Sequence, residues 1–377
     1  IDQLLASVRR FDPHPPFYYL QLHFWMVFGA NDVWVKLNSV VWSIATIIII
    51  FLAGRKLFDL KTALLASLLF ALSPFALFHA QEARMYSMLM CLGIGVFYFI
   101  YRFLEDGAWW TILVALCLMI CFLYSHGTGF MLLVSVGAYA AWDIAEGGRP
   151  QLKRVLPTSI LLVLATVMYI PWLRIAASIS VGHTMTPSLM DVVNTLFKLL
   201  GGFAKQPDWL VLAVIFLFTI GMVSSLFANK RERLLVVAFV LAPIACCIAI
   251  SYLYRPIWLY CTLAYLTPFW MILIARSSLR TCKEIKTFGH KGKSSRRILL
   301  CGWPAIAIVF FVYTQLLQQL SFEHPWHFKN AAEFVKSATQ AGDVVYVPNE
   351  RVLWGIGWYL IGPGSINPLQ SPHAIVG

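Results

Sequence analysis

The sequence predicts an all-α protein that crosses a membrane about ten times, followed by a small α/β segment outside the bilayer. Of its 377 residues, 60% are apolar and 12% are charged, and the mean hydropathy is +0.74. These values exclude an ordinary soluble globular protein. The apolar residues also fall in consecutive stretches, and the short turns between them alternate between rich and poor in Lys and Arg. Such alternation is typical of a multi-pass membrane protein.

Each apolar stretch is close to the ~20 residues that a helix needs to cross ~30 Å of hydrocarbon. The stretches are 33–53, 61–79, 84–103, 109–125, 127–146, 153–174, 208–228, 232–254, 257–276 and 297–320. Residues 17–28 form another apolar, aromatic run, but it is too short to span a bilayer. We expect a helix that starts near Pro16 and lies in the membrane interface.

The positions of the basic residues predict the orientation. Eighteen of the 29 Lys and Arg residues lie in alternate turns, namely 54–61, 102–108, 147–154, 229–233 and 276–297. Because cytoplasmic loops carry an excess of Lys and Arg, these turns are predicted to be cytoplasmic. The other connections are then extracytoplasmic: the chain start, the 81–84 and 125–127 turns, the 175–207 loop, the 255–256 turn and everything after 320.

Three domains follow from this topology. Residues 1–32 are an extracytoplasmic loop with the interfacial helix, and residues 33–320 are the transmembrane helical domain. Residues 321–377 begin an extracytoplasmic α/β domain, with a helical pattern at 328–336 and a short strand at 344–348. No apolar segment precedes Ile1 to bring it to the outer side, so we expect a preceding crossing to be missing from the chain.

The net charge of +12 does not indicate nucleic acid as a partner. The basic excess is concentrated in the predicted cytoplasmic turns, where topology and anionic membrane lipids account for it. Seven of the eight cysteines lie in apolar stretches and the eighth, Cys282, lies in a cytoplasmic turn, so no disulfide framework is expected. Cys117 and Cys121 share a helix face without a nearby His, which favours packing over metal binding. No metal site is assigned.

Glu82 and Arg84 are the strongest candidates for chemistry, within the segment Gln81-Glu82-Ala83-Arg84-Met85-Tyr86. Ionisable groups at the end of a crossing are costly unless they pair or face an aqueous cavity. Arg84 could bind a phosphate with its planar fork of donors. The alternatives are a Glu82–Arg84 salt bridge, or an arginine that extends to the interface.

Other candidates lie on the same predicted side. Asp12 and His14 belong to a proline-stiffened loop at 12–16, which is either functional or a solvated turn. His126 is a secondary candidate, because a lone histidine is more often structural. Arg255 lies among aromatic residues and is either a second phosphate contact or an interface anchor. Several apolar stretches contain a proline, which should kink or end a helix. Cations, carboxylates and histidines above such a helical bundle suit a lipid phosphate or diphosphate, which points to a lipid-linked donor.

Several of these residues occur in motifs of a known family. The motifs are Asp12-Pro13-His14-Pro15-Pro16-Phe17-Tyr18-Tyr19-Leu20, Gly54-Arg55-Lys56-Leu57-Phe58, Ser73-Pro74-Phe75 and Gln81-Glu82-Ala83-Arg84-Met85-Tyr86. In order and spacing they resemble the bacterial members of the dolichyl-phosphate-mannose protein mannosyltransferase superfamily, which have the GT-C membrane glycosyltransferase fold. The resemblance covers residues 5–105 well and 250–350 loosely.

The resemblance implies a membrane glycosyltransferase. Such an enzyme transfers a hexose or pentose, with inversion, from a polyprenyl-phosphate donor to an acceptor hydroxyl on a glycan, lipid or protein. The reaction would take place at the outer face of the bacterial cytoplasmic membrane. No cofactor is assigned, although a divalent metal is compatible with this chemistry.

The resemblance also implies roles for individual residues. Asp12 and Glu82 are the candidate catalytic carboxylates, with the principal base expected upstream of residue 1. Arg84 would bind the donor phosphate, and Arg255 would substitute for the arginine that relatives carry where this chain has Cys261. The remaining candidates are assigned to substrate binding: His14, Gln81, Tyr86 and His126.

Two other classes of protein could use similar residues. A lipid flippase or transporter should carry ionisable residues near mid-bilayer and inverted repeats, which we do not find in the sequence. An O-antigen ligase or polymerase should depend on Arg and His in a large late loop, whereas the 175–207 loop holds only His183, Lys198 and Lys205. A scaffold protein would not require Glu82 and Arg84 at one depth.

Overall fold

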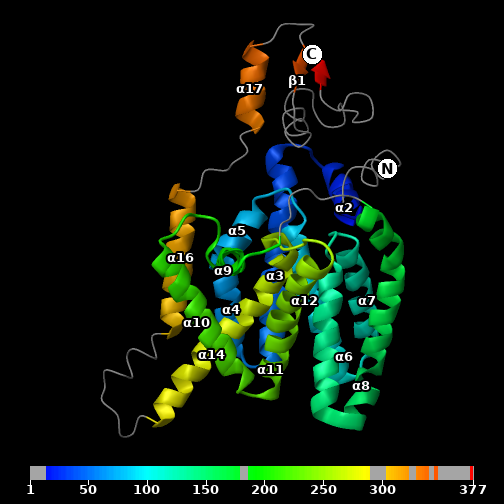
Figure 1. The fold of residues 1–377 in the computed structure, drawn as a ribbon, viewed down its shortest axis with the longest axis vertical. Helices are drawn as coiled ribbons and strands as arrows, with labels where there is room; N and C mark the ends of the chain where they lie inside the picture. Colours follow the sequence, from blue (N-terminus) through cyan, green and yellow to red (C-terminus); the bar gives the residue numbers. More distant parts are fainter. Residues whose placement is uncertain are drawn as a thin grey trace. The chain divides into compact units, whose positions relative to one another are not determined.

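The computed structural model describes residues 14–178, 186–288, 303–321, 328–338, 344–346 and 374–376. The chain divides into two compact units, Ile1–Ser321 and Phe322–Gly377. The first unit is a bundle of helices (Figure 1). In that view α2, α5 and α9 lie toward one end of the bundle, and α11 lies toward the other. These ends are called the α2 end and the α11 end below.

The first helices begin at side-chain caps that the sequence supplies. Asn31 and Asp59 accept the backbone N–H groups of Trp34 and Thr62, so α3 and α4 begin directly after these caps. Ser73 caps α5 and Pro74 occupies its first turn, which breaks the run 61–79 into two helices. The helices are α2 Phe17–Met26, α3 Asp32–Leu57, α4 Leu60–Leu72 and α5 Pro74–Ala80. The start of α2 directly after Pro16 confirms the expected helix start.

The rest of the first unit is also helical in its described residues. The helices are α6 Tyr86–Asp106, α7 Trp109–Leu123, α8 Phe130–Ser178, α9 Leu189–Gly201, α10 Asp208–Leu226, α11 Lys230–Val236, η1 Val237–Leu241, α12 Ala242–Leu253, α13 Tyr260–Leu263, η2 Ala264–Leu266, α14 Thr267–Phe288 and α16 Trp303–Ser321. Helix α6 is the most enclosed candidate span, with 83% of its apolar window buried. It packs against α3, α7 and α8, so it forms the centre of the bundle.

Helix α8 folds back on itself. Straight, its 49 residues would extend for about 74 Å at 1.5 Å per residue. Yet the Tyr169 hydroxyl donates to the Gly127 carbonyl over 3.1 Å, which returns the chain to the end where α8 began. Figure 1 accordingly shows two antiparallel arms. They correspond to two separate candidate spans, Phe130–Gly147 and Val155–Ile175.

The chain is a multi-pass membrane protein, but ten crossings are not confirmed. Among the described residues, six helices are long and apolar enough to span a bilayer. They are Asp32–Leu57, Tyr86–Asp106, Phe130–Gly147, Val155–Ile175, Asp208–Leu226 and Lys230–Leu253. A seventh results if α4 and α5, which are bent by 60°, form one broken span.

The other predicted crossings differ from simple spans for local reasons. Helix α7 has only 15 residues. The stretch 257–276 is divided among α13, η2 and the start of α14, which continues into a charged segment. The predicted loop 175–207 is also wrong in part, because it contains the 13-residue helix α9. A reciprocal capping box between Ser188 and Asp191 starts this helix.

Ion pairs cluster at the α11 end, where charged residues of α11 pair with residues of α8, α14 and α6. Lys230 binds Asp143 at 2.7 Å, and Arg233 binds Glu146 at 2.6 Å, both on α8. Glu232, which is fully buried, accepts from Arg276 at 3.0 Å and from Arg280, both on α14. Arg231 lies 3.8 Å from Glu105 at the end of α6. Buried and partly buried pairs of this kind hold the helix ends in register.

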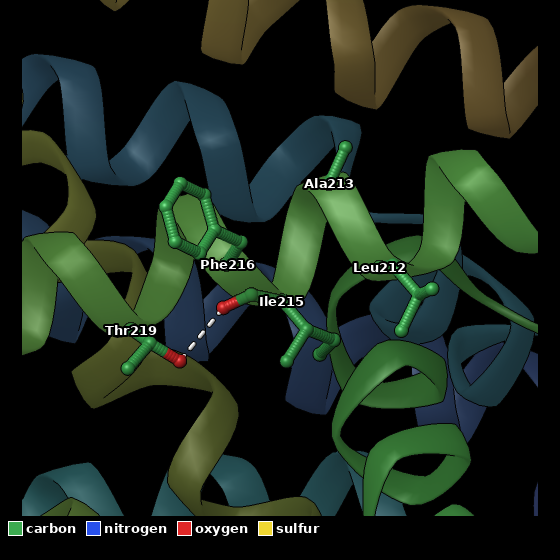
Figure 2. Close-up of a pocket in the computed structure, with 5 residues that line it drawn as sticks. All are labelled: Leu212, Ala213, Ile215, Phe216 and Thr219. Atoms are coloured by element: carbon green, nitrogen blue, oxygen red, sulfur yellow. Dashed lines mark hydrogen bonds between the residues drawn. The ribbon is translucent and has the colours of Figure 1, made fainter.

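Helix α10 presents an apolar face. Its candidate span is only 17% buried. Figure 2 shows Leu212, Ala213, Ile215, Phe216 and Thr219 around a shallow apolar hollow on this helix. The Thr219 hydroxyl donates to the Ile215 carbonyl over 2.8 Å, so its hydrogen bond is satisfied within the helix. Such a surface suits contact with lipid chains.

The second unit has few described elements. Helix α17 spans Phe328–Ala338, where the sequence predicts a helix. Strands β1 Val344–Tyr346 and β2 Ala374–Val376 pair antiparallel, with Val345 opposite Ile375. These elements do not confirm the predicted α/β segment.

Candidate functional site

The turn between α5 and α6 carries the strongest sequence candidates, and its backbone is held in place. The Arg84 N–H donates to the Glu82 carbonyl over 2.9 Å. The hydroxyl of Ser39, on α3, donates to the same carbonyl over 2.6 Å. Gln81 and Arg84 are exposed, and the Glu82 side chain is 21% exposed. The turn therefore offers a fixed carboxylate and an accessible guanidinium at the α2 end.

The Glu82 carboxylate has a histidine partner that the sequence did not indicate. Nδ1 of His79, in α5, lies 2.9 Å from Oε2 of Glu82. His79 is fully buried, and its ring centroid is 4.5 Å from that of Phe75 and 4.6 Å from that of Tyr86. This imidazole connects the carboxylate to the aromatic interior.

His14 and His126 form a pair of tilted rings at the same end, with 35° between their planes. Their ring centroids are 4.4 Å apart, and the Gly127 N–H donates to Nδ1 of His14 over 3.2 Å. Nδ1 of His126 accepts from the Thr128 N–H, also over 3.2 Å. Because both Nδ1 atoms accept backbone N–H groups, the neutral rings carry their protons on Nε2. Burial lowers the pKa of His126 well below its ordinary value, and the nearby His14 lowers the pKa further, so His126 is neutral.

Tyr86 joins these two groups. Its ring centroid lies 4.6 Å from that of His79 and 6.0 Å from that of His126. The start of α2 is fixed beside them, because the Phe17 N–H donates to the Tyr124 carbonyl over 2.8 Å. The structure therefore brings His14, Gln81, Glu82, Arg84, Tyr86 and His126 to one end of the bundle.

Three further residues reach this group from the second half of the chain. Tyr260 stacks on His79 with a centroid separation of 6.3 Å. Phe203 packs on Tyr260 at 5.1 Å, and the Lys198 ammonium lies 5.6 Å from the centre of the Tyr260 ring. Lys198 thus adds a half-exposed cation that the sequence did not single out. It lies on α9, whose capping box is the signal that could have placed it on a helix.

The remaining predicted residues have different outcomes. Asp12 lies outside the described residues, as does any base before residue 1. Arg255 lies in the loop before α13, where its N–H donates to the Ile250 carbonyl over 2.9 Å. The Cys261 thiol lies beside the hydroxyls of Tyr86 and Tyr260. It is also close enough to Glu82 and Arg84 to be affected by their charges. Within the part of the chain that the structure describes, no three His, Cys, Asp or Glu side chains are grouped to hold a metal ion.

The first half of the chain matches a family model. Residues 13–175 match the dolichyl-phosphate-mannose-protein mannosyltransferase family. This match covers less than half of the chain, and over that part the chain resembles the family. The matched segment includes the 81–86 segment, His14 and His126, whereas Lys198, Phe203 and Tyr260 lie beyond it.

Solved structures show the same GT-C fold. ArnT from Cupriavidus metallidurans in the apo state aligns with a TM-score of 0.62 at 13% identity, over 92% of this chain and 74% of that one. ArnT bound to undecaprenyl phosphate aligns with a TM-score of 0.63 at 12% identity, over 95% and 78%. The oligosaccharyltransferase AglB from Archaeoglobus fulgidus, in complex with an inhibitory peptide and a dolichol-phosphate, aligns with a TM-score of 0.54 at 12% identity, over 95% and 55%. No curated protein matches the sequence.

Proposed function

We propose that this protein transfers a sugar from a polyprenyl-phosphate donor to an acceptor hydroxyl. The observation that carries the proposal is the fixed pair of Glu82 and Arg84 on one turn, at an end where membrane helices terminate. A carboxylate and a guanidinium so placed can serve the two ends of a displacement at the membrane surface. The family match, and the likeness to ArnT bound to undecaprenyl phosphate, support a lipid phosphate as the leaving group.

The donor phosphate is the part of the substrate that the cations suit. Arg84 is exposed and offers a planar fork of N–H donors, which matches the oxygens of a phosphate. The Lys198 ammonium lies over the Tyr260 ring. Tyr260 is also close enough to Arg84 to be affected by the charge of its guanidinium. Two cations near Tyr260 would stabilise the negative charge that develops on the phosphate as its bond to the sugar breaks. Arg255 remains a further candidate for this contact.

The reaction needs a proton acceptor for the attacking hydroxyl. The acceptor oxygen forms a bond to the anomeric carbon, the bond from that carbon to the phosphate oxygen breaks, and the electron pair stays on the phosphate. The hydroxyl proton passes to a carboxylate. Glu82 is fixed for this role by its contacts with Ser39 and His79, and Asp12 is the second candidate. His14, Gln81, Tyr86 and His126 would line the substrate site.

The location of the site follows from the charge distribution. Lys230, Arg231, Arg233, Arg276 and Arg280 all pair with carboxylates at the α11 end. Because basic residues favour the cytoplasmic side, the α2 end is then the outer face. We place the reaction at the outer face of a bacterial cytoplasmic membrane. The acceptor would be a glycolipid, a cell-surface polysaccharide or a protein.

The test is sugar transfer by the purified protein in lipid vesicles. Each assay contains one polyprenyl-phosphate-linked hexose or pentose, together with lipid, glycan and peptide acceptors. Arg84→Ala should lower kcat by about 100- to 1000-fold, the loss typical of one oxyanion-stabilising donor. Arg174→Ala is the matched control, because Arg174 is exposed near the end of α8 and should leave transfer unchanged. Equal activity of the two variants would remove Arg84 from the site.

A further inference from the structure

His79 is a buried imidazole that contacts the candidate base Glu82 but takes no part in the proposed proton transfer. It lies in α5 and is fully enclosed. Aromatic rings surround it, with centroid distances of 4.5 Å to Phe75, 5.1 Å to Phe78 and 6.3 Å to Tyr260. Burying a polar ring among aromatic side chains costs free energy unless a hydrogen bond offsets the loss of water. The position of that hydrogen bond therefore indicates what the ring does.

The hydrogen bond of His79 is directed at Glu82. Nδ1 of His79 lies 2.9 Å from Oε2 of Glu82. An ionised carboxylate only accepts hydrogen bonds, so Nδ1 carries the hydrogen and donates it. Nε2 is buried and has no hydrogen-bond partner among the described residues. The polar interaction of this ring thus serves the carboxylate.

We propose that His79 is a positioning residue that holds the Glu82 carboxylate in one orientation. The inference rests on the proposed function and deepens it. Ser39 holds the backbone of Glu82 through a 2.6 Å hydrogen bond, and His79 holds its side chain. A proton acceptor must lie within hydrogen-bond reach of the attacking hydroxyl, and small displacements are costly. Both halves of Glu82 are fixed in this way.

The packing of His79 explains how it can hold Glu82 rigidly. Phe75 meets the ring edge-on at 79°, whereas Tyr260 lies nearly parallel to it at 21°. Phe203 contacts it from the loop after α9, at 90° and 5.8 Å. An imidazole enclosed from several sides has few rotamers left, so the direction of its Nδ1–H is determined by packing. During transfer His79 keeps its Nδ1 hydrogen, and the proton from the acceptor goes to Glu82.

The experiment compares three substitutions in the vesicle assay, with kcat and the KM for the donor measured separately for each variant. His79→Phe keeps an aromatic ring but removes the donor. His79→Asn places an amide N–H near the position of the lost Nδ1–H. His23→Phe is the matched control, because His23 is exposed on α2 and lies outside the site.

We expect His79→Phe to lower kcat by about 10- to 100-fold, with little change in KM for the donor. His79→Asn should restore most of kcat, because its amide can again donate to Glu82. His23→Phe should match the wild type throughout.

Two results would overturn the role of His79 alone. One is a His79→Phe protein with the kcat of the wild type. The other is an equal loss of kcat in His79→Phe and His79→Asn, which would show that His79 acts through packing only. A wild-type protein that transfers no sugar from any polyprenyl-phosphate donor would instead overturn the proposed function, and this inference with it.

Discussion

Gln318 of α16 connects three segments beneath the candidate site, and its removal should weaken both stability and activity. Its Nε2 donates to the Pro74 carbonyl over 3.0 Å, and its Oε1 accepts from the Phe203 N–H over 2.8 Å. The residue is 7% exposed. Gly202 has a φ of 79°, and a Cβ there would lie 2.1 Å from Oε1 of Gln318. The loop at 202–203 therefore packs tightly against the start of α5 and against α16.

Gln318→Leu keeps the size of the side chain but removes both hydrogen bonds. The Pro74 carbonyl is buried and the Phe203 N–H is partly buried, so both lose partners that water cannot readily replace. Each unsatisfied group costs about 1–3 kcal/mol, so the loss of both partners should lower the free energy of unfolding by about 2–6 kcal/mol in total. Phe203 packs on Phe78 with centroids 4.5 Å apart. A loosened loop should therefore also lower kcat.

The assay is reversible unfolding in mixed detergent micelles, followed by helix content, together with sugar transfer in vesicles. Gln319→Leu is the matched control, because it makes the same change at an exposed neighbour on the same helix. This control should stay within about 0.5 kcal/mol of the wild type. If Gln318→Leu were as stable and as active as Gln319→Leu, the two hydrogen bonds of Gln318 would not contribute to stability or activity.

Two further predictions concern the α11 end. Glu232→Ala leaves Arg276 and Arg280 without their shared buried carboxylate, and should lower the free energy of unfolding by about 3–5 kcal/mol. Glu105→Ala, at an exposed pair, should cost less than about 1 kcal/mol, and equal losses would contradict the role of burial. Partial burial of Asp59 opposes its ionisation, but hydrogen bonds from Thr62 and the charge of Arg276 outweigh this and hold its pKa below the ordinary value. Because the pKa of Asp59 is lower in the folded state than its unfolded-state value of 3.8, the ionised carboxylate stabilises the fold above that value. This stabilisation is lost as the pH falls through the folded-state pKa. Asp59→Asn should therefore reduce the loss of stability below about pH 4. Unchanged acid unfolding in Asp59→Asn would count against this linkage.

The sequence predicted the half of the site that lies in short turns. Glu82, Arg84 and His126 stand out because they interrupt long apolar runs, and a polar residue between two apolar stretches must lie near a helix end. His14 stands out because prolines surround it. Positions of this kind can be read along the chain without knowledge of packing.

The other half of the site depends on tertiary contacts. His79 lies inside an apolar run, and Phe203 and Tyr260 are more than a hundred residues away along the chain, so no local pattern relates them. Lys198 belongs to a segment that was interpreted as loop, although Ser188 and Asp191 form a capping box at its start. The predicted count of ten crossings is not confirmed, because apolar runs do not show how a stretch is divided into helices. Hydropathy over about 20 residues cannot detect a 60° break at Ser73–Pro74.

The most direct test of the account is the fate of the donor lipid. Wild-type protein in vesicles receives a donor that is labelled in both the sugar and the polyprenyl phosphate, together with the acceptor that it glycosylates. The account predicts one polyprenyl monophosphate released for each sugar transferred, and loss of both products in Arg84→Ala. A donor that changes leaflet with its sugar–phosphate bond intact, or a requirement for a lipid diphosphate donor, would contradict it.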